Sequence, residues 1–156
     1  MGVPLVALGQ LIRMWSAGYL TKLSGLVTAG PFAMCRNPLY IGSFFMSLGY
    51  MVMCNRLVVL IIGTILFWIL HGAAVAYEER LLREKFGDDF AYYCKRVPRF
   101  LPRLRRSDGQ GSFSFKQVIA NDEHCGAASA ALILTAFGLM AYKSFSVINW
   151  LAGLLG

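Results

Sequence analysis

The chain has 156 residues, of which 57% are hydrophobic and only 15% are charged, and its mean hydropathy is +0.57. An average soluble domain has about 25% charged residues, and a soluble chain this short cannot bury so much apolar surface in one core. The composition excludes an ordinary soluble domain and predicts an all-α, polytopic membrane protein whose apolar side chains face lipid. The net charge of +7 would also suit nucleic-acid binding, but that does not explain the long apolar runs, so we expect no nucleic-acid partner.

The first apolar run, residues 3–12, is too short to cross a hydrocarbon core of about 30 Å. We expect an interfacial or half-buried helix there, or the remnant of a longer span. Residues 13–38 mix charged, polar and small side chains, which indicates a segment at the membrane surface. No basic stretch precedes the first run and it contains Pro4, so it lacks the pattern of a cleavable signal peptide.

Two apolar stretches, 39–54 and 57–77, predict a transmembrane hairpin. Asn37 is a favoured N-cap and Pro38 suits a first helical position, so the first helix should begin there. Asn55-Arg56 predicts a tight turn, and the second stretch is long enough to span at about 1.5 Å per residue. Small residues that allow close helix packing lie on both helices: Gly42, Ser43, Ser47, Gly49, Gly63 and Thr64.

Residues 78–94 change character abruptly, with apolar side chains at helical spacing among charges. This pattern predicts a cytosolic amphipathic helix on the membrane surface, broken near Gly87. We expect a membrane core of 1–104, a polar linker of 105–125 and a C-terminal membrane extension of 126–156 that holds one further span.

Basic residues are distributed unevenly along the chain. Ten Lys or Arg residues lie between Arg80 and Lys116, and three more precede the first clear span. With the first two spans in a hairpin, thirteen of the fifteen share one side, which the positive-inside rule makes cytoplasmic. We therefore expect an integral protein of the inner (cytoplasmic) membrane, in contact with membrane lipids. The four cysteines have no metal-binding spacing, so no metal site is expected, and the oligomeric state is left open.

The two ends of the hairpin carry opposite charges. Arg36 precedes the first helix, and Glu78 and Glu79 follow the second. A short turn makes the helices antiparallel neighbours, so these groups should lie close together at the membrane–water boundary, with Gly30 and Pro31 just upstream. The pattern predicts a polar site at the cytosolic end of the hairpin.

Four motifs follow one another in the chain: LIRMWSAGYL, LVTAGPF, CRNPLYIG, and a run that begins EERLL and ends VPRFLP. In this order, around a two-span hairpin, they resemble the isoprenylcysteine carboxyl methyltransferase family, which is related to phospholipid methyltransferases. The resemblance covers about 8–104. It implies a membrane enzyme that takes a methyl group from S-adenosyl-L-methionine and transfers it to a lipophilic small molecule or lipidated substrate that enters from the bilayer.

The resemblance also implies roles for individual residues. Arg36 and Glu79 are expected to be catalytic. The expected cofactor-binding residues are Gly30, Pro31, Arg36, Asn37, Pro38, Tyr40, Glu78 and Glu79. The segment expected to close over the cofactor contains Phe86, Gly87, Tyr93, Val97 and Pro98. The family often has His where Asn37 stands.

Methyl transfer from a sulfonium is an in-line displacement, so the protein mainly aligns the reactants and excludes water. An amine acceptor must first lose a proton, whereas a carboxylate needs no general base. No obvious base stands in the motifs, which favours an isoprenylcysteine-type carboxylate or another lipid acid as the acceptor.

Simpler interpretations of these residues stay open. Arg36 can be an anchor on the positive side of the membrane, and Asn37-Pro38 only a helix start. Glu78-Glu79 can be a solvated turn, and the basic cluster between 95 and 106 is expected to hold the chain against anionic headgroups. His71 lies inside the second span, where a polar residue is a functional candidate, but a hydrogen-bonded packing histidine fits equally well.

Two other functions compete with methyl transfer. NADPH-dependent membrane reductases of the sterol-reductase type end in a run similar to KFGDDFAYYCKRVP, but they carry an acid after the glycine of the preceding motif, where this chain has Ser43. A non-catalytic membrane scaffold is the other alternative, and it predicts that neither cofactor binds.

Overall fold

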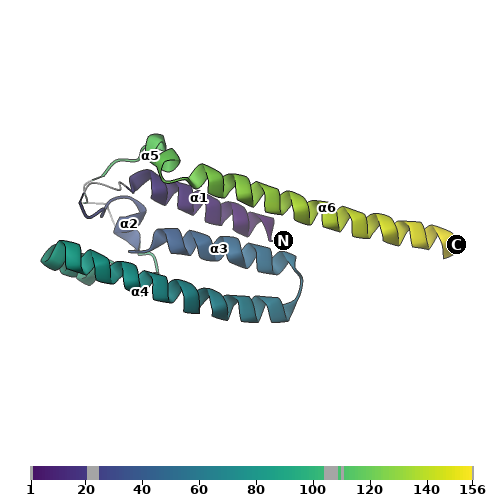
Figure 1. Ribbon diagram of the computed structural model, residues 1–156, viewed down its shortest axis with the longest axis horizontal. Helices are drawn as coiled ribbons and strands as arrows, with labels where there is room; N and C mark the ends of the chain where they lie inside the picture. The colour runs from purple at the N-terminus through teal and green to yellow at the C-terminus, as the bar shows by residue number, and fades with distance from the viewer. Residues whose placement is uncertain (1, 21–24, 104–108, 110, 156) are drawn as a thin grey trace. The chain divides into compact units, whose positions relative to one another are not determined.

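The computed structural model describes residues 2–20, 25–103, 109 and 111–155, with side chains as far as 143. Within these ranges every regular element is a helix, so the all-α prediction is confirmed for them. The helices are α1 (Val3–Tyr19), α2 (Pro31–Met34), α3 (Pro38–Met53), α4 (Leu57–Arg96), α5 (Phe115–Ala120) and α6 (Glu123–Leu155), shown in Figure 1. The chain divides into two compact units, 1–124 and 125–156. The three predicted domain boundaries stay a prediction.

Two helices are long and apolar enough to cross a membrane: α4, and α6 over Glu123–Lys143. The apolar part of α4 has a mean hydropathy of 2.4, yet Leu57 is 70% exposed and Ile69 is 61% exposed. A helix in the core of a soluble protein would bury such side chains, so this exposed apolar surface suits contact with lipid or with another apolar surface. α3 is apolar but shorter.

α1 is longer than the sequence predicts. The expected helix of 3–12 continues to Tyr19, through residues that we assigned to the membrane surface. Ser16 donates its hydroxyl hydrogen to the backbone oxygen of Ile12 at 2.7 Å, which satisfies the polar group inside the helix. Ser16, Ala17 and Gly18 are buried, so their small size reflects close packing rather than a surface segment.

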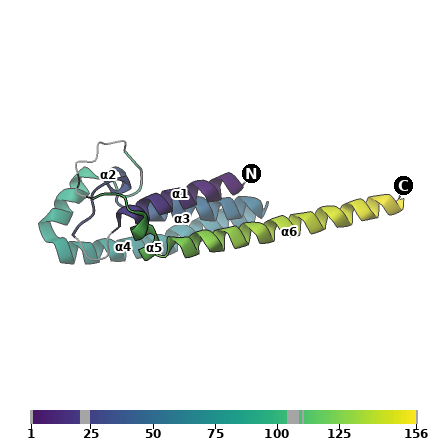
Figure 2. The ribbon, with the colours of Figure 1, turned by 90° about the horizontal axis from the view of Figure 1, so that it is seen from above.

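Two pairs of glycines set the contact between α1 and α3. A Cβ atom on Gly42 would lie 2.7 Å from the backbone oxygen of Gly9, and one on Gly49 would lie 2.7 Å from that of Gly2. Such short separations leave no room for a side chain, so the two backbones approach closely. Figure 2 shows the helices side by side. Small residues do mediate helix packing, as expected. Gly42 and Gly49 of α3 face α1 rather than α4, the hairpin partner of α3.

α3 and α4 form the predicted hairpin (Figure 1). The turn contains Asn55 with a φ of 50°, a left-handed conformation that asparagine tolerates well. Aromatic rings then fill the space between the helices. Phe44 of α3 lies with its ring centroid 5.4 Å from that of Phe67 and 5.2 Å from that of Trp68.

α4 bends sharply at Gly87, which has φ 50° and ψ −119°. The predicted break at this residue is confirmed. Beyond the bend Phe90, Tyr93 and Val97 are buried together, and Leu26 packs against them. Figure 2 shows the last turns of α4 reversing towards α2. The bend therefore returns the amphipathic part of α4 to the end of the hairpin where the charged groups lie.

Part of the expected polar linker is an ordered segment, residues 111–124, which we call the capping segment. It contains α5 and lies against the C-terminal end of α1. Asn121 donates from its side-chain amide to the backbone oxygens of Ala17 and Leu20, at 2.9 Å and 2.8 Å. The Ala17 oxygen also accepts from the backbone N–H of Leu20 at 3.2 Å, so the segment adds further hydrogen bonds at that helix end, where carbonyls lack the regular helical donor.

Candidate functional site

Glu79 of α4 is the centre of a buried cluster that joins both ends of the hairpin. Arg99 donates two hydrogen bonds to its Oε2 atom, at 3.0 Å and 2.6 Å. Asn37 donates to Oε1 at 3.1 Å, and the guanidinium of Arg36 lies 3.5 Å from the same oxygen. The structure thus places Arg36 beside Glu79, as the hairpin predicts.

The groups around Glu79 favour its ionised form. Burial by itself raises the pKa of the carboxyl group. The hydrogen bonds from Arg99 and Asn37 and the positive charge of Arg36 outweigh burial, so the pKa lies below its ordinary value of 4.5. The pKa of Arg99 is raised, chiefly because Glu79 accepts its hydrogen bonds. The cluster is therefore charged and fixed at neutral pH.

Asn37 contributes to this cluster rather than to the helix end. α3 begins at Pro38, as predicted, but the Asn37 side chain makes no capping hydrogen bond. Its amide donates to Glu79 and, at 3.2 Å, to the backbone oxygen of Arg99. The predicted N-cap position of Asn37 is confirmed, but its side chain does not cap the helix, because the buried carboxylate offers it a stronger, charge-assisted partner.

Arg99 is the member of the cluster that sequence reasoning missed. The sequence places it in a basic cluster at the headgroups, and its spacing from Glu79 matches no helical or motif pattern. Because α4 reverses direction, the segment that follows it runs beside the start of α3. The backbone N–H of Arg36 donates to the oxygen of Pro98 at 2.9 Å, which fixes that path.

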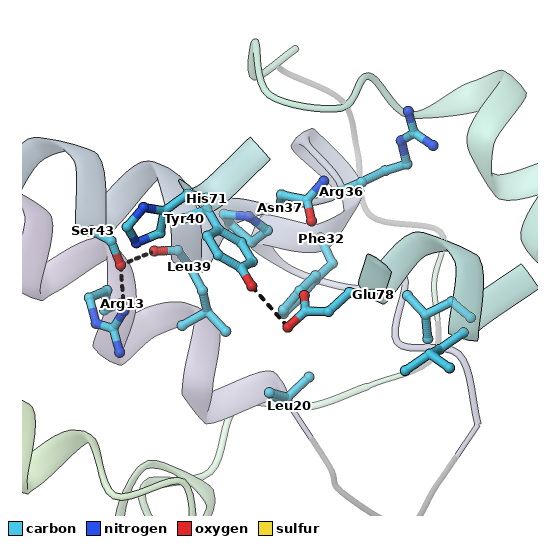
Figure 3. Close-up of a pocket in the computed structure, with 13 residues that line it drawn as sticks. Arg13, Leu20, Phe32, Arg36, Asn37, Leu39, Tyr40, Ser43, His71 and Glu78 are labelled. Carbon is cyan, nitrogen blue, oxygen red and sulfur yellow. Dashed lines mark hydrogen bonds between the residues drawn. The ribbon is translucent and has the colours of Figure 1, made fainter. Parts of the chain in front are cut away.

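A cavity of about 550 Å³ lies next to the cluster, between the end of α1, the start of α3 and the middle of α4. Figure 3 shows the side chains that surround it. Most of its surface is apolar, and the polar groups come from both ends of the hairpin. It is lined by Arg13, Leu20, Phe32, Arg36, Asn37, Pro38, Leu39, Tyr40, Ser43, His71, Glu78, Leu81 and Leu82.

Two charged groups of this cavity have unused bonding capacity. Glu78 accepts a hydrogen bond from the Tyr40 hydroxyl at 2.9 Å, and it forms no ion pair with any described residue. Arg36 donates from Nη1 to the Cys94 sulfur at 2.6 Å, but its buried Nε has no hydrogen-bond partner in the described part of the chain. Glu78 therefore brings a carboxylate without an ion pair to the cavity, and Arg36 beside it has one buried N–H without an acceptor among the described residues.

Glu79 and Glu78 point to different sides of α4. Glu79 is absent from the residues that line the 550 Å³ cavity and instead borders a smaller one of about 230 Å³, together with Arg99. Successive helical residues project in different directions, so adjacent glutamates cannot serve one face. The position of Glu79 suits a residue that holds Arg36 in place. The catalytic role predicted for Glu79 stays a prediction.

Gly30 and Pro31 lie behind the cavity wall rather than on it. Gly30 has a φ of 57°, and a Cβ atom there would lie 2.6 Å from the ring of Tyr19. Pro31 is buried at the start of α2, and the next residue, Phe32, reaches the cavity. Tyr93 donates its hydroxyl hydrogen to the Phe32 backbone oxygen at 2.7 Å. These two predicted cofactor residues therefore shape the wall that Phe32 presents.

A second cavity of about 270 Å³ adjoins the first. The two share four lining residues: Leu20, Phe32, Arg36 and Leu82. The second is otherwise lined by residues around the bend of α4 and before α2: Gly25, Leu26, Val27, Lys85, Phe86 and Tyr93. Arg36 and Phe32 thus stand between two adjacent spaces, an arrangement that can hold two reactants side by side.

His71 lines the larger cavity and is held on two sides. Its Nδ1 lies 3.0 Å from the backbone oxygen of Phe67, so that nitrogen carries the hydrogen. Its ring stacks on the Phe67 ring at 3.9 Å and meets Tyr40 edge-on at 5.8 Å. His71 is thus a hydrogen-bonded packing residue and also lines the cavity, so both interpretations of its sequence position hold.

Residues 1–89 match the family model described as phospholipid methyltransferase. The chain belongs to the phospholipid methyltransferase family. Arg36, Glu78 and Glu79 lie inside the match to this family, whereas Arg99 lies beyond it. The sequence-based resemblance to isoprenylcysteine carboxyl methyltransferases is confirmed, because proteins of that name are among the relatives.

Three relatives to which the chain is similar carry different names. The chain is 34% identical over 128 residues to the cobalt-zinc-cadmium resistance protein CzcN of Cupriavidus metallidurans, a match that covers 78% of this chain and 57% of the relative. It is 35% identical over 106 residues to the nickel-cobalt-cadmium resistance protein NccN of Alcaligenes xylosoxydans, covering 67% and 48%. It is 35% identical over 80 residues to the protein-S-isoprenylcysteine O-methyltransferase of Mus musculus, covering 51% and 28%. The chain thus spans less than two thirds of each of these relatives.

Proposed function

We propose that the protein transfers a methyl group from S-adenosyl-L-methionine to a lipophilic acid, such as an isoprenylcysteine-type carboxylate, at the cytosolic face of the membrane. One observation carries the proposal. A single, largely apolar cavity is lined both by Glu78, which forms no ion pair with any described residue, and by Arg36, whose buried Nε has no hydrogen-bond partner in the described part of the chain. The amino-acid end of the cofactor has the complementary groups, an ammonium and a carboxylate.

The residues present fit this cofactor. Arg36 would bind its carboxylate and Glu78 a positive group, because charge-assisted hydrogen bonds are the strong ones in a partly buried site. The aromatic residues around the 270 Å³ cavity, Phe32, Phe86 and Tyr93, would pack against the adenine. S-adenosylmethionine supplies a methyl group on a positively charged sulfur.

The chain's own residues then position and desolvate the reactants. Glu79, Arg99 and Asn37 hold Arg36 in place, so its donors are fixed before a ligand arrives. The leucines of the larger cavity exclude water, which favours a displacement between oppositely charged groups. A carboxylate acceptor has no proton to lose, so His71 is not required as a base. The O-methyltransferase name of the mouse relative supports an oxygen acceptor.

We also propose a topology for this activity. α3, α4 and α6 cross the membrane, with the turn at Asn55 on the outside. The site then lies at the inner boundary, next to most of the basic residues, where the positive-inside rule places them. The exposed apolar surface of α4 supports this arrangement.

Ligand-dependent thermal stability tests the proposal. S-adenosylhomocysteine should raise the melting temperature of the purified chain in detergent, and NADPH should not, because a ligand stabilises only a protein that binds it. The Arg36→Ala and Glu78→Gln variants should each weaken S-adenosylhomocysteine binding by about 1–3 kcal/mol in calorimetry, the usual effect of a lost charged hydrogen bond.

The Glu84→Gln variant is the matched control, because Glu84 is an exposed acid on the same helix that pairs with Arg80, one turn before it. It should leave the affinity unchanged. Stabilisation by NADPH alone would favour the reductase alternative, and no effect of either ligand would favour a scaffold.

A further inference from the structure

The larger cavity contains a second arginine that the cofactor does not need. Arg13 comes from α1 and lines the cavity together with Ser43 of α3. Figure 3 shows Arg13 and Ser43 on one side of the group of lining residues and Arg36 on the other. The cofactor has a single carboxylate, for which Arg36 already provides the free donor. Arg13 is thus available for a different ligand.

The guanidinium of Arg13 is held rigidly from outside the cavity. Its Nε and Nη2 donate to the two carboxylate oxygens of Glu123, at 3.1 Å and 2.5 Å. Its Nη1 donates to the Ser43 hydroxyl at 2.6 Å. Glu123 itself is only 5% exposed. A guanidinium has five N–H groups, so these three bonds fix its orientation and leave one N–H on each terminal nitrogen without a partner among the described residues.

The surroundings indicate what those two donors take. Adjacent N–H groups of arginine match the two oxygens of a carboxylate. Leu20 and Leu39 line the same cavity, so an anion bound there would have an apolar wall beside it. This combination suits a carboxylate attached to a hydrocarbon chain rather than a free inorganic anion.

We propose that Arg13, oriented by Glu123 and Ser43, binds the carboxylate of the lipid acid acceptor and selects it over uncharged lipids. The inference rests on the proposed function and names the residue that recognises the second reactant. Glu123 is a positioning residue, and through it the capping segment completes a site whose other residues come from α1, α3 and α4.

The transfer step is balanced without a base. A carboxylate oxygen forms a bond to the methyl carbon, the carbon–sulfur bond breaks, and its electron pair stays on sulfur. The negative acid and the positive sulfonium become a neutral ester and a neutral thioether. Because the ester no longer carries a charge, Arg13 holds the product less tightly than the acid, which favours release.

Binding of two matched probes tests this inference. Dodecanoate and methyl dodecanoate differ by the methyl group alone. The wild-type chain in neutral-lipid nanodiscs, saturated with S-adenosylhomocysteine, should bind dodecanoate about tenfold or more tightly than its ester, as expected for one charged hydrogen-bonded pair. The Arg13→Gln variant should lose this preference. The Arg13→Lys variant keeps the charge that Glu123 needs but loses the two free donors, so it should fold and lose most of the preference.

The controls separate this inference from the proposed function. Arg80→Gln removes a 78%-exposed arginine and should keep the preference. Arg36→Ala should lose affinity for S-adenosylhomocysteine and, measured without it, keep the preference for the acid. A wild-type chain that binds S-adenosylhomocysteine but binds the two probes equally, or a preference that survives in both Arg13 variants, overturns the inference and leaves the proposed function standing. Failure to bind S-adenosylhomocysteine overturns the proposed function instead.

Discussion

At the scale of single residues, Glu79 couples the stability of the site to pH. Its pKa in the folded chain lies below its ordinary value of 4.5, so its interactions stabilise the fold fully above pH 4.5. Below that pH the unfolded chain takes up the proton first, and the stabilisation is lost as the pH falls towards the folded-state pKa. The melting temperature should therefore fall on acidification by less in the Glu79→Gln variant than in the wild type. Equal falls in both would contradict this role.

Tyr93 anchors the cavity wall through one hydrogen bond. Its buried hydroxyl donates to the backbone oxygen of Phe32, so Tyr93→Phe leaves that oxygen unsatisfied. We expect a loss of about 1–3 kcal/mol in the free energy of unfolding, measured by chemical denaturation. The adjacent Tyr92 is 61% exposed, and its hydroxyl accepts a hydrogen bond from the exposed Arg96 side chain at 3.1 Å, so Tyr92→Phe should have little effect.

The sequence predicts the meeting of Arg36 and Glu79 because one short turn connects their helices. It does not predict Arg99, because that contact depends on a reversal of the chain and on an irregular segment with no periodicity. Nor does it predict the pair of Arg13 and Glu123, which are separated by 110 residues. Local patterns report on neighbours along a helix or across a turn, and these contacts belong to neither class.

At the scale of helices, the α1–α3 contact depends on the absence of side chains. In the Gly49→Ala variant the new Cβ atom would lie 2.6 Å from a methyl carbon of Val6 and 2.7 Å from a backbone oxygen, so the helices must separate. We expect a lower melting temperature. Gly72→Ala is the control, since no atom lies within 4 Å of its Cβ position and alanine favours helix by about 1 kcal/mol. A Gly49→Ala variant as stable as Gly72→Ala would refute close packing here.

The bend of α4 depends on a conformation that favours glycine. At Gly87 the φ of 50° strains any residue with a side chain, although nothing lies within 4 Å of a Cβ atom there. Gly87→Ala should therefore cost about 1–3 kcal/mol through backbone strain alone. Chemical denaturation measures this cost. Gly72→Ala again serves as the control, because it adds the same methyl group to a regular helical turn.

Helix positions were predicted well where the pattern was strong, as for α3, the first part of α4 and the break at Gly87. The full length of α1 was missed because its last turns are rich in small and polar residues, which read as a surface segment in the absence of their packing partners. The order of the capping segment was missed for the same reason: Asn121 and Glu123 look solvated until α1 is placed beside them.

At the scale of the whole molecule, the proposed topology places the two ends of α4 on opposite sides of the membrane. Cys54, at the turn, is exposed, so a membrane-impermeant maleimide should label it from outside in sealed right-side-out vesicles. In a variant with cysteine only at Arg83→Cys, labelling should require permeabilised vesicles. Labelling of both positions from the same side would rule out the hairpin orientation.

The paired glycines at the contact between α1 and α3 also determine where Arg13 lies relative to Ser43. Gly2 and Gly9 are seven residues apart, as are Gly42 and Gly49, so both pairs can meet in only one alignment of the two helices. Sliding one helix by a single turn would bring bulky side chains against the opposite backbone. The glycines thus fix the alignment in which Arg13, one turn after Gly9 along α1, meets Ser43, the residue next to Gly42 on α3, before any ligand is bound.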